Sequence, residues 1–289
     1  MKEITVISGK GGTGKTSVSG SLAALCAGGI FTDCDVDAAN LSLLMRPVLQ
    51  EKHEFKASRE ASIREDQCNQ CGLCRQLCRF EAISENFRVD PLSCEGCGVC
   101  FYACPQEAVD LQEVLSGHWF VSRTPYGPLV HARLGIAEEN SGKLVTQVRQ
   151  KAREMGQDEE KKWLVTDGPP GIGCPVIASL SGASTALIVT EPTLSAVHDM
   201  ERVLDVCRHF QVSARICINR HDLSQENSRR IEEFCRNQGV PLAGRIPQDN
   251  SVTEAMLKGI PVVEYNNGPA SKSIKKIWNR LQDELARGH

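Results

Sequence analysis

Eight of the fourteen cysteines in this 289-residue chain form one pattern that occurs twice. Both copies have the spacing C-x2-C-x2-C-x3-C, and the second lies 26 positions after the first, as from Cys68 to Cys94. The eight residues are Cys68, Cys71, Cys74, Cys78, Cys94, Cys97, Cys100 and Cys104. At the same offset Gly72 recurs as Gly98, and Glu81-Ala82-Ile83 recurs as Glu107-Ala108-Val109. The repetition predicts a duplicated unit with two similar thiol-rich sites.

Two other uses of these cysteines are less consistent with the sequence. Disulfide scaffolds belong to short secreted chains, whereas this chain opens with Met1-Lys2-Glu3 and then a predicted strand, without the features of a signal peptide. Zinc sites usually pair two C-x2-C units across a longer loop. They do not explain three cysteines at two-residue gaps followed by a fourth. The spacing therefore favours iron–sulfur ligands.

The pattern resembles that of bacterial ferredoxins, in which three cysteines of one run bind one [4Fe–4S] cluster and the fourth binds the other. The resemblance implies two clusters with crossed ligands. One set is Cys68, Cys71, Cys74 and Cys104, and the other is Cys94, Cys97, Cys100 and Cys78. Cys104 precedes Pro105, as in ferredoxins, but Cys78 precedes Arg79, so the local turn departs from the pattern there.

Composition limits the partners of the chain. A hydrophobic content of 41% and a charged content of 24% are ordinary for a soluble globular protein. The net charge of −3 argues against nucleic acid as a partner, because such binding needs a concentrated basic face. No apolar stretch approaches the ~20 residues that span a bilayer, so we expect no membrane insertion. Many thiols without an export signal indicate the cytoplasm.

Strands and helices alternate outside the cysteine-rich region. Strands are predicted at 4–8, 30–32, 163–167, 186–190, 216–219 and 242–246, and helices follow the first strand and span 143–153, 194–210, 225–237 and 271–285. This alternation predicts an α/β fold with a parallel sheet covered on both faces. The cysteine-rich region interrupts it and predicts a small inserted α+β domain. We expect an ATPase domain at 1–57 and 113–289, the insert at 58–112, and a hairpin at 118–134.

A phosphate-binding loop follows the first strand. Residues 9–16, GKGGTGKT, fit G-x-x-x-x-G-K-[ST] between a strand and a helix, which is the context that this motif requires. Lys15 is expected to contact the β- and γ-phosphates of ATP, and the Thr16 hydroxyl to bind Mg²⁺. The other predicted nucleotide contacts in this loop are Gly11, Gly12, Thr13, Gly14 and Ser17. The sequence therefore predicts a P-loop ATPase.

Lys10 distinguishes this loop from an ordinary P-loop. The run KGGTGKT resembles the deviant Walker motif of the MinD/ParA-type ATPases, which include the Mrp-like carriers and the nitrogenase iron protein. In that family the extra lysine reaches across a dimer to the nucleotide of the partner. The resemblance implies that Lys10 is catalytic together with Lys15, and that the chain forms a homodimer or a heterodimer with a related ATPase.

The family resemblance assigns further residues. The segment 33–41, DCDVDAANL, resembles switch I, which implies that Asp35 orients the attacking water and that Asp33 lies nearer the metal, with Asp37 a weaker candidate. The segment 165–171, VTDGPPG, resembles switch II, where Asp167 would hold Mg²⁺ through water. Gly168 and Gly171 would sense the γ-phosphate. The resemblance also covers 139–143 and 173–175, and it places adenine contacts at 219–222, foremost Asn219, and at 246–249.

Other features favour structural roles. Cys174 and the five remaining cysteines, Cys26, Cys34, Cys207, Cys217 and Cys235, are expected to be small buried residues. The histidines show no paired metal spacing. The last predicted helix has one apolar side and is expected to dock on the sheet, although MinD-like proteins use an amphipathic tail at membranes.

These features together predict an ATP-hydrolysing dimer that contains two [4Fe–4S] clusters and couples nucleotide state to electron transfer toward a redox partner. The alternative is an ATP-dependent assembly factor or carrier for iron–sulfur or other metal cofactors. Full ligation by cysteine favours electron transfer, because a cluster held by four protein thiolates is difficult to donate. A positioning ATPase with a redox sensor is a third class, and it lacks the expected basic face or membrane tail.

Overall fold

The structure is a computed structural model that describes residues 1–135 and 141–287. The chain divides into two compact units. The first contains Met1–Lys52, Trp119–Arg133 and the chain from Ser141 onward. Among the described residues, the second contains His53–His118 together with Leu134 and Gly135. Of the segment 139–143 that contributed to the family resemblance, residues 139 and 140 lie outside the described residues. Ser141 begins a helix.

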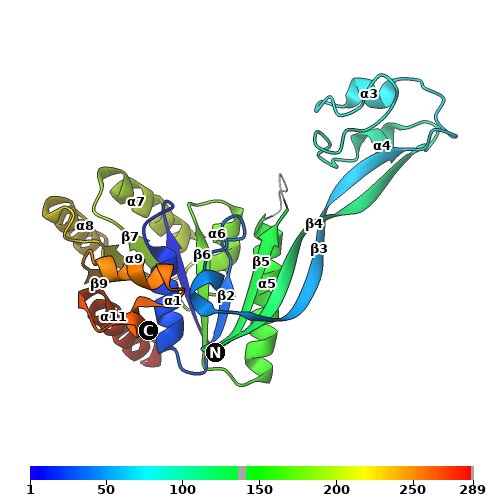
Figure 1. Ribbon diagram of the computed structural model, residues 1–289. Helices are drawn as coiled ribbons and strands as arrows, with labels where there is room; N and C mark the ends of the chain where they lie inside the picture. The colour runs from blue at the N-terminus through cyan, green and yellow to red at the C-terminus, as the bar shows by residue number, and fades with distance from the viewer. Residues whose placement is uncertain (136–140, 288–289) are drawn as a thin grey trace. The chain divides into compact units, whose positions relative to one another are not determined.

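A twisted sheet forms the core of the first unit (Figure 1). Within the described residues its strand order is β3-β4-β5-β2-β6-β1-β7-β8-β9. The strands are β1 (Lys2–Ser8), β2 (Ile30–Asp33), β3 (Val48–Ile63), β4 (Val109–Thr124), β5 (Gly127–Leu134), β6 (Trp163–Pro170), β7 (Thr185–Thr190), β8 (Ala214–Asn219) and β9 (Leu242–Ile246). From β5 to β9 every neighbouring pair is parallel, as the sequence predicts.

Helices cover both faces of this sheet. They are α1 (Lys15–Leu25), α2 (Ser42–Met45), α5 (Ser141–Asp158), α6 (Cys174–Leu180), α7 (Leu194–His209), α8 (Gln225–Gln238), α9 (Asn250–Leu257), α10 (Val262–Tyr265) and α11 (Pro269–Ala286). One buried cluster joins α1, α9, α10 and α11 to the sheet, and a second joins α6, α7 and α8 to its other face. The fully buried strand β7 has apolar side chains pointing both ways, which suits a sheet covered on both sides.

The predicted elements lie where the sequence places them, with ends that shift by a few residues. The hairpin predicted at 118–134 is the β4–β5 pair with its turn at Pro125-Tyr126. The last helix docks as predicted: Ile274, Ile277 and Trp278 are buried, and the Trp278 ring lies 5.3 Å from the Trp163 ring. None of the helices described is both long and apolar enough to cross a membrane.

The cysteines outside the repeat are buried with one exception. Five of them belong to the core, namely Cys26, Cys34, Cys207, Cys217 and Cys235. Burial in apolar surroundings raises the pKa of the Cys217 thiol to about 12, which keeps it protonated and unreactive. The prediction that Cys174 is buried was wrong. It begins α6, where the chain leaves the end of the sheet, and its side chain is exposed.

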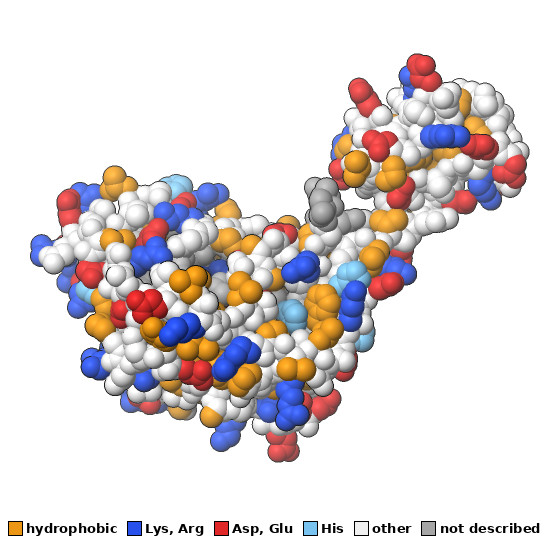
Figure 2. Space-filling view, in the orientation of Figure 1, with side chains coloured by type: hydrophobic (Ala, Val, Ile, Leu, Met, Phe, Trp, Pro, Cys, Tyr) orange, Lys and Arg blue, Asp and Glu red, His pale blue; other side chains and the backbone are white. Residues whose placement is uncertain are grey.

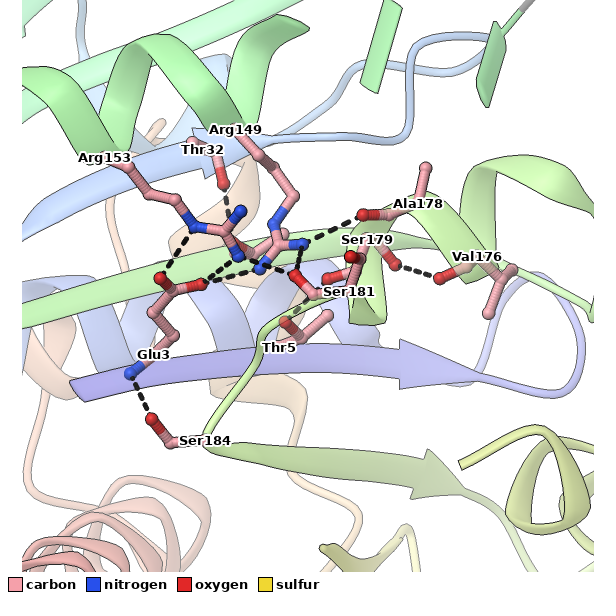
Figure 3. Close-up of polar contacts among 11 residues, drawn as sticks. Glu3, Thr5, Thr32, Arg149, Arg153, Val176, Ala178, Ser179, Ser181 and Ser184 are labelled. Carbon is pink, nitrogen blue, oxygen red and sulfur yellow. Dashed lines mark hydrogen bonds and ion pairs between the residues drawn. The ribbon is translucent and has the colours of Figure 1, made fainter. Parts of the chain in front are cut away.

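A buried charge network fixes one end of α6 (Figure 3). The guanidinium of Arg149 donates 2.7 Å to Glu3 Oε2, 2.9 Å to the Ala178 carbonyl and 2.5 Å to the Ser181 carbonyl. Arg153 donates to both carboxylate oxygens of Glu3 at 2.7 Å. Arg149 is 1% exposed. The network therefore satisfies carbonyls at the carboxyl end of α6 that the helix itself leaves without partners.

Removing the carboxylate from this network is expected to destabilise the fold. Glu3→Ala leaves the buried Arg149 without a counter-ion, which typically costs about 3–5 kcal/mol. Glu226→Ala is the matched control, because Glu226 pairs with Arg230 on the exposed face of α8, where such a pair contributes ~0.3–0.5 kcal/mol. The urea midpoint of unfolding should fall for the first variant and hardly change for the second. Equal shifts would contradict this account.

Two long strands lead into and out of the second unit. β3 and β4 each have 16 residues and are neighbours in the sheet order, so the chain leaves the first unit and returns to it along one ribbon. The insert ends expected at 58 and 112 fall within these strands, whereas the second unit spans His53–His118. Composition located the cysteine repeat but not the ribbon, because the residues of β3 are as polar as those of the insert.

The sequence repeat is also a structural repeat. Gly72 and Gly98 precede two five-residue helices, α3 (Leu73–Leu77) and α4 (Val99–Ala103), with φ of 80° and 78°. The start of each repeat bonds to the end of the other: Arg64 N donates to the Ala108 carbonyl, and Asp90 N to the Ala82 carbonyl, both at 2.8 Å. The two halves of this unit are therefore interlocked, because the start of each is hydrogen-bonded to the end of the other.

Candidate functional site

A cavity of about 890 Å³ opens at the carboxyl ends of the strands in the first unit. The P-loop, the segment after β2, the end of β6 and the segments after β8 and β9 line it. Ligands of open parallel sheets bind at this edge, and the volume suits a small-molecule cofactor. Of the predicted nucleotide contacts, Gly11, Gly12, Gly14, Lys15, Thr16, Ser17 and Asn219 line the cavity.

The P-loop is held in shape from β8. Gly14 precedes α1 with φ of 86°, a backbone conformation that favours glycine. The Asn219 amide donates 2.8 Å to the Thr13 carbonyl and lies where a Cβ on Gly14 would be. Asn219 therefore contacts the loop itself, in addition to lining the cavity where adenine contacts were predicted. Thr13 is buried, and its hydroxyl has no hydrogen-bond partner among the described residues.

Lys15 connects the P-loop to two acidic segments. Its Nζ lies 3.0 Å from Asp167 Oδ1 in β6 and 3.3 Å from Asp35 Oδ2 after β2. The Thr16 hydroxyl donates 2.9 Å to Asp167 Oδ2. Lys15, Thr16, Asp35 and Asp167 thus meet in one place. An ammonium, a hydroxyl and carboxylates are the groups that commonly bind phosphate and Mg²⁺.

Burial and mutual charge set the protonation of this group. Burial acts to lower the pKa of the Lys15 ammonium, but the attraction of Asp167 and Asp35 outweighs it and raises that pKa above its usual value. Burial raises the pKa of the Asp35 carboxyl, and Lys15 opposes the shift only in part. Lys15 therefore stays charged, and Asp35 is a stronger base than an exposed aspartate.

Asp33 lies behind the cavity, within electrostatic reach of Lys15 and Asp167. It is fully buried and does not line the cavity. One carboxylate oxygen accepts from the Asp35 backbone N–H at 3.2 Å and the other from that of Leu41 at 3.0 Å. Burial, and then repulsion from Asp167, raises the pKa of Asp33 well above its usual range. Asp33 thus fixes the turn that presents Asp35, while Asp37 lines the cavity without an ion pair in the described chain.

The switch II segment contacts the cavity through its prolines. Pro169 and Pro170 line it, whereas Gly168 and Gly171 do not. Gly168 lies within β6, tightly packed against Ile7. Gly171 has φ of 90° and donates 2.8 Å to the Ser8 carbonyl of β1. In this conformation the two glycines shape the turn behind the cavity.

Lys10 is bound within its own chain. Its Nζ lies 3.2 Å from Glu191 Oε1 and within 3.4 Å of the hydroxyls of Thr193 and Ser195, all between β7 and the start of α7. It does not line the cavity. Glu191 also pairs with Arg220 at 3.3 Å. The side chain of the signature lysine is therefore held by an ion pair with Glu191 of its own chain.

Sequence reasoning missed two contributors to this site. The Ser19 hydroxyl donates 2.7 Å to Asp167 Oδ1. Ser19 lies four residues after Lys15 and so on the same side of α1, which is a spacing that the sequence does show. Met256 of α9 lines the cavity beyond Ser17. It comes from a distant part of the sequence without a motif, so no local pattern indicates it.

Two small cavities in the second unit each contain four cysteines of the repeat. One is lined by Cys68, Cys71, Cys74 and Cys104, and the other by Cys78, Cys94, Cys97 and Cys100. In both, the fourth cysteine comes from the other run, because the two halves are interlocked. Backbone N–H groups point at sulfur in the first cavity, Gln70 to Cys68 at 3.4 Å and Ala108 to Cys104 at 3.3 Å. In the residues that the structure covers, no His, Cys, Asp or Glu group is arranged to hold a single metal ion.

Comparison with known proteins identifies the family. Residues 4–262 match the CobQ/CobB/MinD/ParA nucleotide binding domain. The chain belongs to this family. It is accordingly a P-loop ATPase of the MinD/ParA type.

Individual relatives agree with this assignment. The chain is 32% identical to the uncharacterized protein MJ0578 of Methanocaldococcus jannaschii over 98% of this chain and 97% of that protein. It is 27% identical to the iron-sulfur cluster carrier protein of Pyrococcus furiosus over 44% of this chain and 47% of that protein. Its fold is similar to that of the septum site-determining protein MinD of Pyrococcus horikoshii, solved with Mg-ADP, with a TM-score of 0.61, 20% identity and coverage of 99% and 97%.

Proposed function

We propose that this ATPase binds MgATP at the Lys15 cavity as a dimer and couples ATP hydrolysis to electron transfer through two [4Fe–4S] clusters in the insert. The observation that carries the proposal is the sorting of the eight repeat cysteines into two cavities of four. An ATPase of this family that has two such thiol sites joins nucleotide chemistry to redox chemistry in a single chain.

The donor sets support cubane clusters over single ions. A [4Fe–4S] cube takes one thiolate on each of four irons, so its ligands need not converge on one point. Each cavity offers four cysteines, and the N–H groups directed at Cys68 and Cys104 suit sulfurs that carry negative charge. The lining is otherwise mainly apolar, with Ile63 and Phe87 in one cavity and Ile83 and Phe80 in the other. When bound, the clusters supply one-electron redox chemistry.

The residues around Lys15 support ATP hydrolysis with Mg²⁺. Thr16 and Asp167 would hold the metal, and Lys15 would turn from its carboxylate partners to the terminal phosphates. That movement frees Asp35 at the mouth of the turn fixed by Asp33. Asp35 would then orient a water and accept its proton while the water oxygen attacks the γ-phosphorus and the bond to the ADP oxygen breaks. The products are ADP and inorganic phosphate.

Replacing Asp35 tests this role. Asp35→Asn should lower kcat for ATP hydrolysis by about 10²-fold or more, which is the usual contribution of a positioned base. Asp37→Asn is the matched control, since Asp37 lines the same cavity without contacting Lys15. Because burial raises the pKa of Asp35, the parent rate should fall as pH drops through a range above that of ordinary aspartates, and this acidic limb should vanish in Asp35→Asn. Phosphate-release assays across a range of pH measure these rates. An equal loss of kcat in Asp35→Asn and Asp37→Asn would contradict the role proposed for Asp35.

Dimerisation offers a use for Lys10. In the single chain its charge is neutralised by Glu191, which is itself shared with Arg220. The family resemblance implies that this lysine contacts the nucleotide of a second chain. A partner phosphate would compete with Glu191 for the ammonium, so ATP binding and dimerisation would be linked.

The path of the chain supports coupling between nucleotide and insert. Only Arg46 and Pro47 separate α2, which follows the Asp35 segment, from β3. Arg46 donates 3.3 Å to the Tyr126 hydroxyl in the β4–β5 turn, and Tyr126 donates 2.7 Å to Glu264 of α10. Both segments that lead to the insert are therefore tied to one point of the ATPase unit. A change in the Asp35 segment would reach β3 within a few residues.

Anaerobic purification followed by EPR-monitored reduction tests the proposal. Iron analysis should give about eight irons per chain, and MgATP should shift the cluster potentials or the affinity for a redox partner. Zinc in place of iron would overturn the cluster assignment. Clusters whose potentials and partner affinity ignore MgATP would overturn the coupling.

A second candidate is the assembly or delivery of iron–sulfur clusters. The similarity to the iron-sulfur cluster carrier protein of Pyrococcus furiosus favours it, although that similarity covers less than half of either chain. Intact transfer of iron and sulfide to an apo-ferredoxin acceptor, stimulated by MgATP, would support this role over electron transfer.

A further inference from the structure

We propose that the exposed side of α4 is a docking face for a redox protein with an apolar centre and a basic rim, and that electrons pass through the cluster held by Cys78, Cys94, Cys97 and Cys100. The proposal rests on the function proposed above and adds the place and chemistry of the partner. We call Val99, Phe101 and Tyr102 the α4 face. Figure 2 shows apolar side chains at the surface of the unit that contains this helix.

The α4 face consists of large apolar side chains that are exposed to solvent. Val99 is 45% exposed, Phe101 41% and Tyr102 81%. Val99 and Tyr102 lie three residues apart, on one side of the helix, and the rings of Phe101 and Tyr102 touch edge to face with centroids 5.2 Å apart. Aromatic side chains that are exposed together are enriched at protein interfaces.

The internal repeat supplies a comparison for this face. α3 and α4 have the same length and the same glycine before them, so equivalent positions meet the same backbone. Where α4 exposes Phe101 and Tyr102, α3 exposes Arg75 and Gln76. The fold therefore accepts polar residues at these positions, and folding alone does not require the aromatic pair. We therefore attribute the exposed aromatic pair to an interaction with a partner molecule.

Charge distinguishes the two repeats in the same way. The first repeat contains Arg64, Arg75 and Arg79, whereas residues 89–122 contain no lysine or arginine. In the described chain the exposed Glu95 and Glu107 form no ion pair. The segment that forms α4 and its flanks is therefore apolar and acidic, with Arg64 of the first repeat bound at the backbone of Glu107 and paired with Asp110. Such a surface attracts a positively charged rim and repels a second copy of itself.

The position of the α4 face explains why the partner is a redox protein. α4 carries Cys100, and Val99 lines the cavity together with the four cysteines. Cys97 is exposed. A protein seated on Tyr102 and Val99 would thus approach this cysteine set across a single side-chain layer. Transient redox complexes bury small interfaces, which suits a face of this size.

Calorimetric titration of the oxidised, cluster-loaded protein with oxidised mammalian cytochrome c, a lysine-rimmed redox protein, tests the face at low salt. Because both proteins are oxidised, no electron passes between them, and the heat measured reports binding alone. The double variant Phe101→Gln/Tyr102→Gln leaves the charge unchanged and should weaken Kd about tenfold, or about 1.4 kcal/mol. Glu95→Asn, which copies Asn69 of the first repeat, should weaken Kd and reduce its salt dependence. Gln76→Ala on α3 is the matched control and should bind as the parent does.

Three outcomes overturn the proposal. The double variant binds cytochrome c as tightly as the parent, or Gln76→Ala weakens binding equally, or sedimentation shows that Tyr102→Gln dissolves a self-association through this face. EPR spectra and iron content are recorded for every variant first. Loss of clusters from the parent protein would refute the proposed function instead, so the two failures are distinct.

Discussion

Lys15→Ala is expected to lower the rate of ATP hydrolysis about 10²- to 10³-fold, which is the usual loss when one preorganised charge partner is removed from a reacting centre. The variant deletes the ammonium that Asp35 and Asp167 both contact, and with it the charge that would turn toward the phosphates. ATP affinity should fall as well, because the carboxylates near the cavity then repel an anionic ligand. Phosphate release and binding of a fluorescent nucleotide measure the two effects.

Lys258→Ala controls for the loss of one positive charge. Lys258 lies over the Tyr265 ring, 4.8 Å from its centroid, and does not line the cavity. Its removal changes net charge as Lys15→Ala does and should leave hydrolysis within a factor of two or so of the parent. Similar losses in both variants would show that net charge, and not the contact with Asp35 and Asp167, sets the rate.

The sequence predicted that the residues around Lys15 lie together, because they are adjacent in the chain or lie toward the carboxyl ends of neighbouring strands. Lys15 and Thr16 belong to one motif, and Asp167 lies in the second half of β6, the strand next to β1. Parallel strands bring their carboxyl ends to one edge, so the meeting of these residues follows from the fold class. The order of strands and helices could also be predicted from the sequence, because strands that are buried on both faces appear in it as short apolar runs.

What the sequence missed depends on contacts between distant segments. The family resemblance placed Asp33 near the metal but gave no sign that its oxygens accept from the backbone N–H groups of Leu41 and Asp35, which only the folded turn reveals. The β3–β4 ribbon has an irregular pattern of burial, so no alternation marked its 16-residue strands. Cys174 was expected to be a core cysteine, yet it begins α6 where the chain leaves the sheet. The residues next to it in the sequence do not indicate that this position is exposed.

Removal of Cys104 is expected to eliminate or convert the cluster of the first run, although Cys104 belongs to the second run. Cys104 lines the cavity of Cys68, Cys71 and Cys74 because Arg64 and Ala108 join the ends of the two repeats. Cys104→Ala should therefore change one of the two cluster signals in the EPR spectrum of the reduced protein. Iron should fall from about eight toward about four per chain. Cys174→Ala is the control, since this exposed cysteine lies outside both cavities.

Double variants separate crossed from uncrossed ligation. If the ligands are crossed, Cys71→Ala/Cys104→Ala damages one cavity twice and costs no more iron than either single change. Cys97→Ala/Cys104→Ala damages both cavities and should lose nearly all iron. Changes at one site are not additive, whereas changes at independent sites are. The reverse outcome, with the Cys97 and Cys104 pair losing one cluster only, would show that each run binds its own cluster and that the interlocked halves do not exchange ligands.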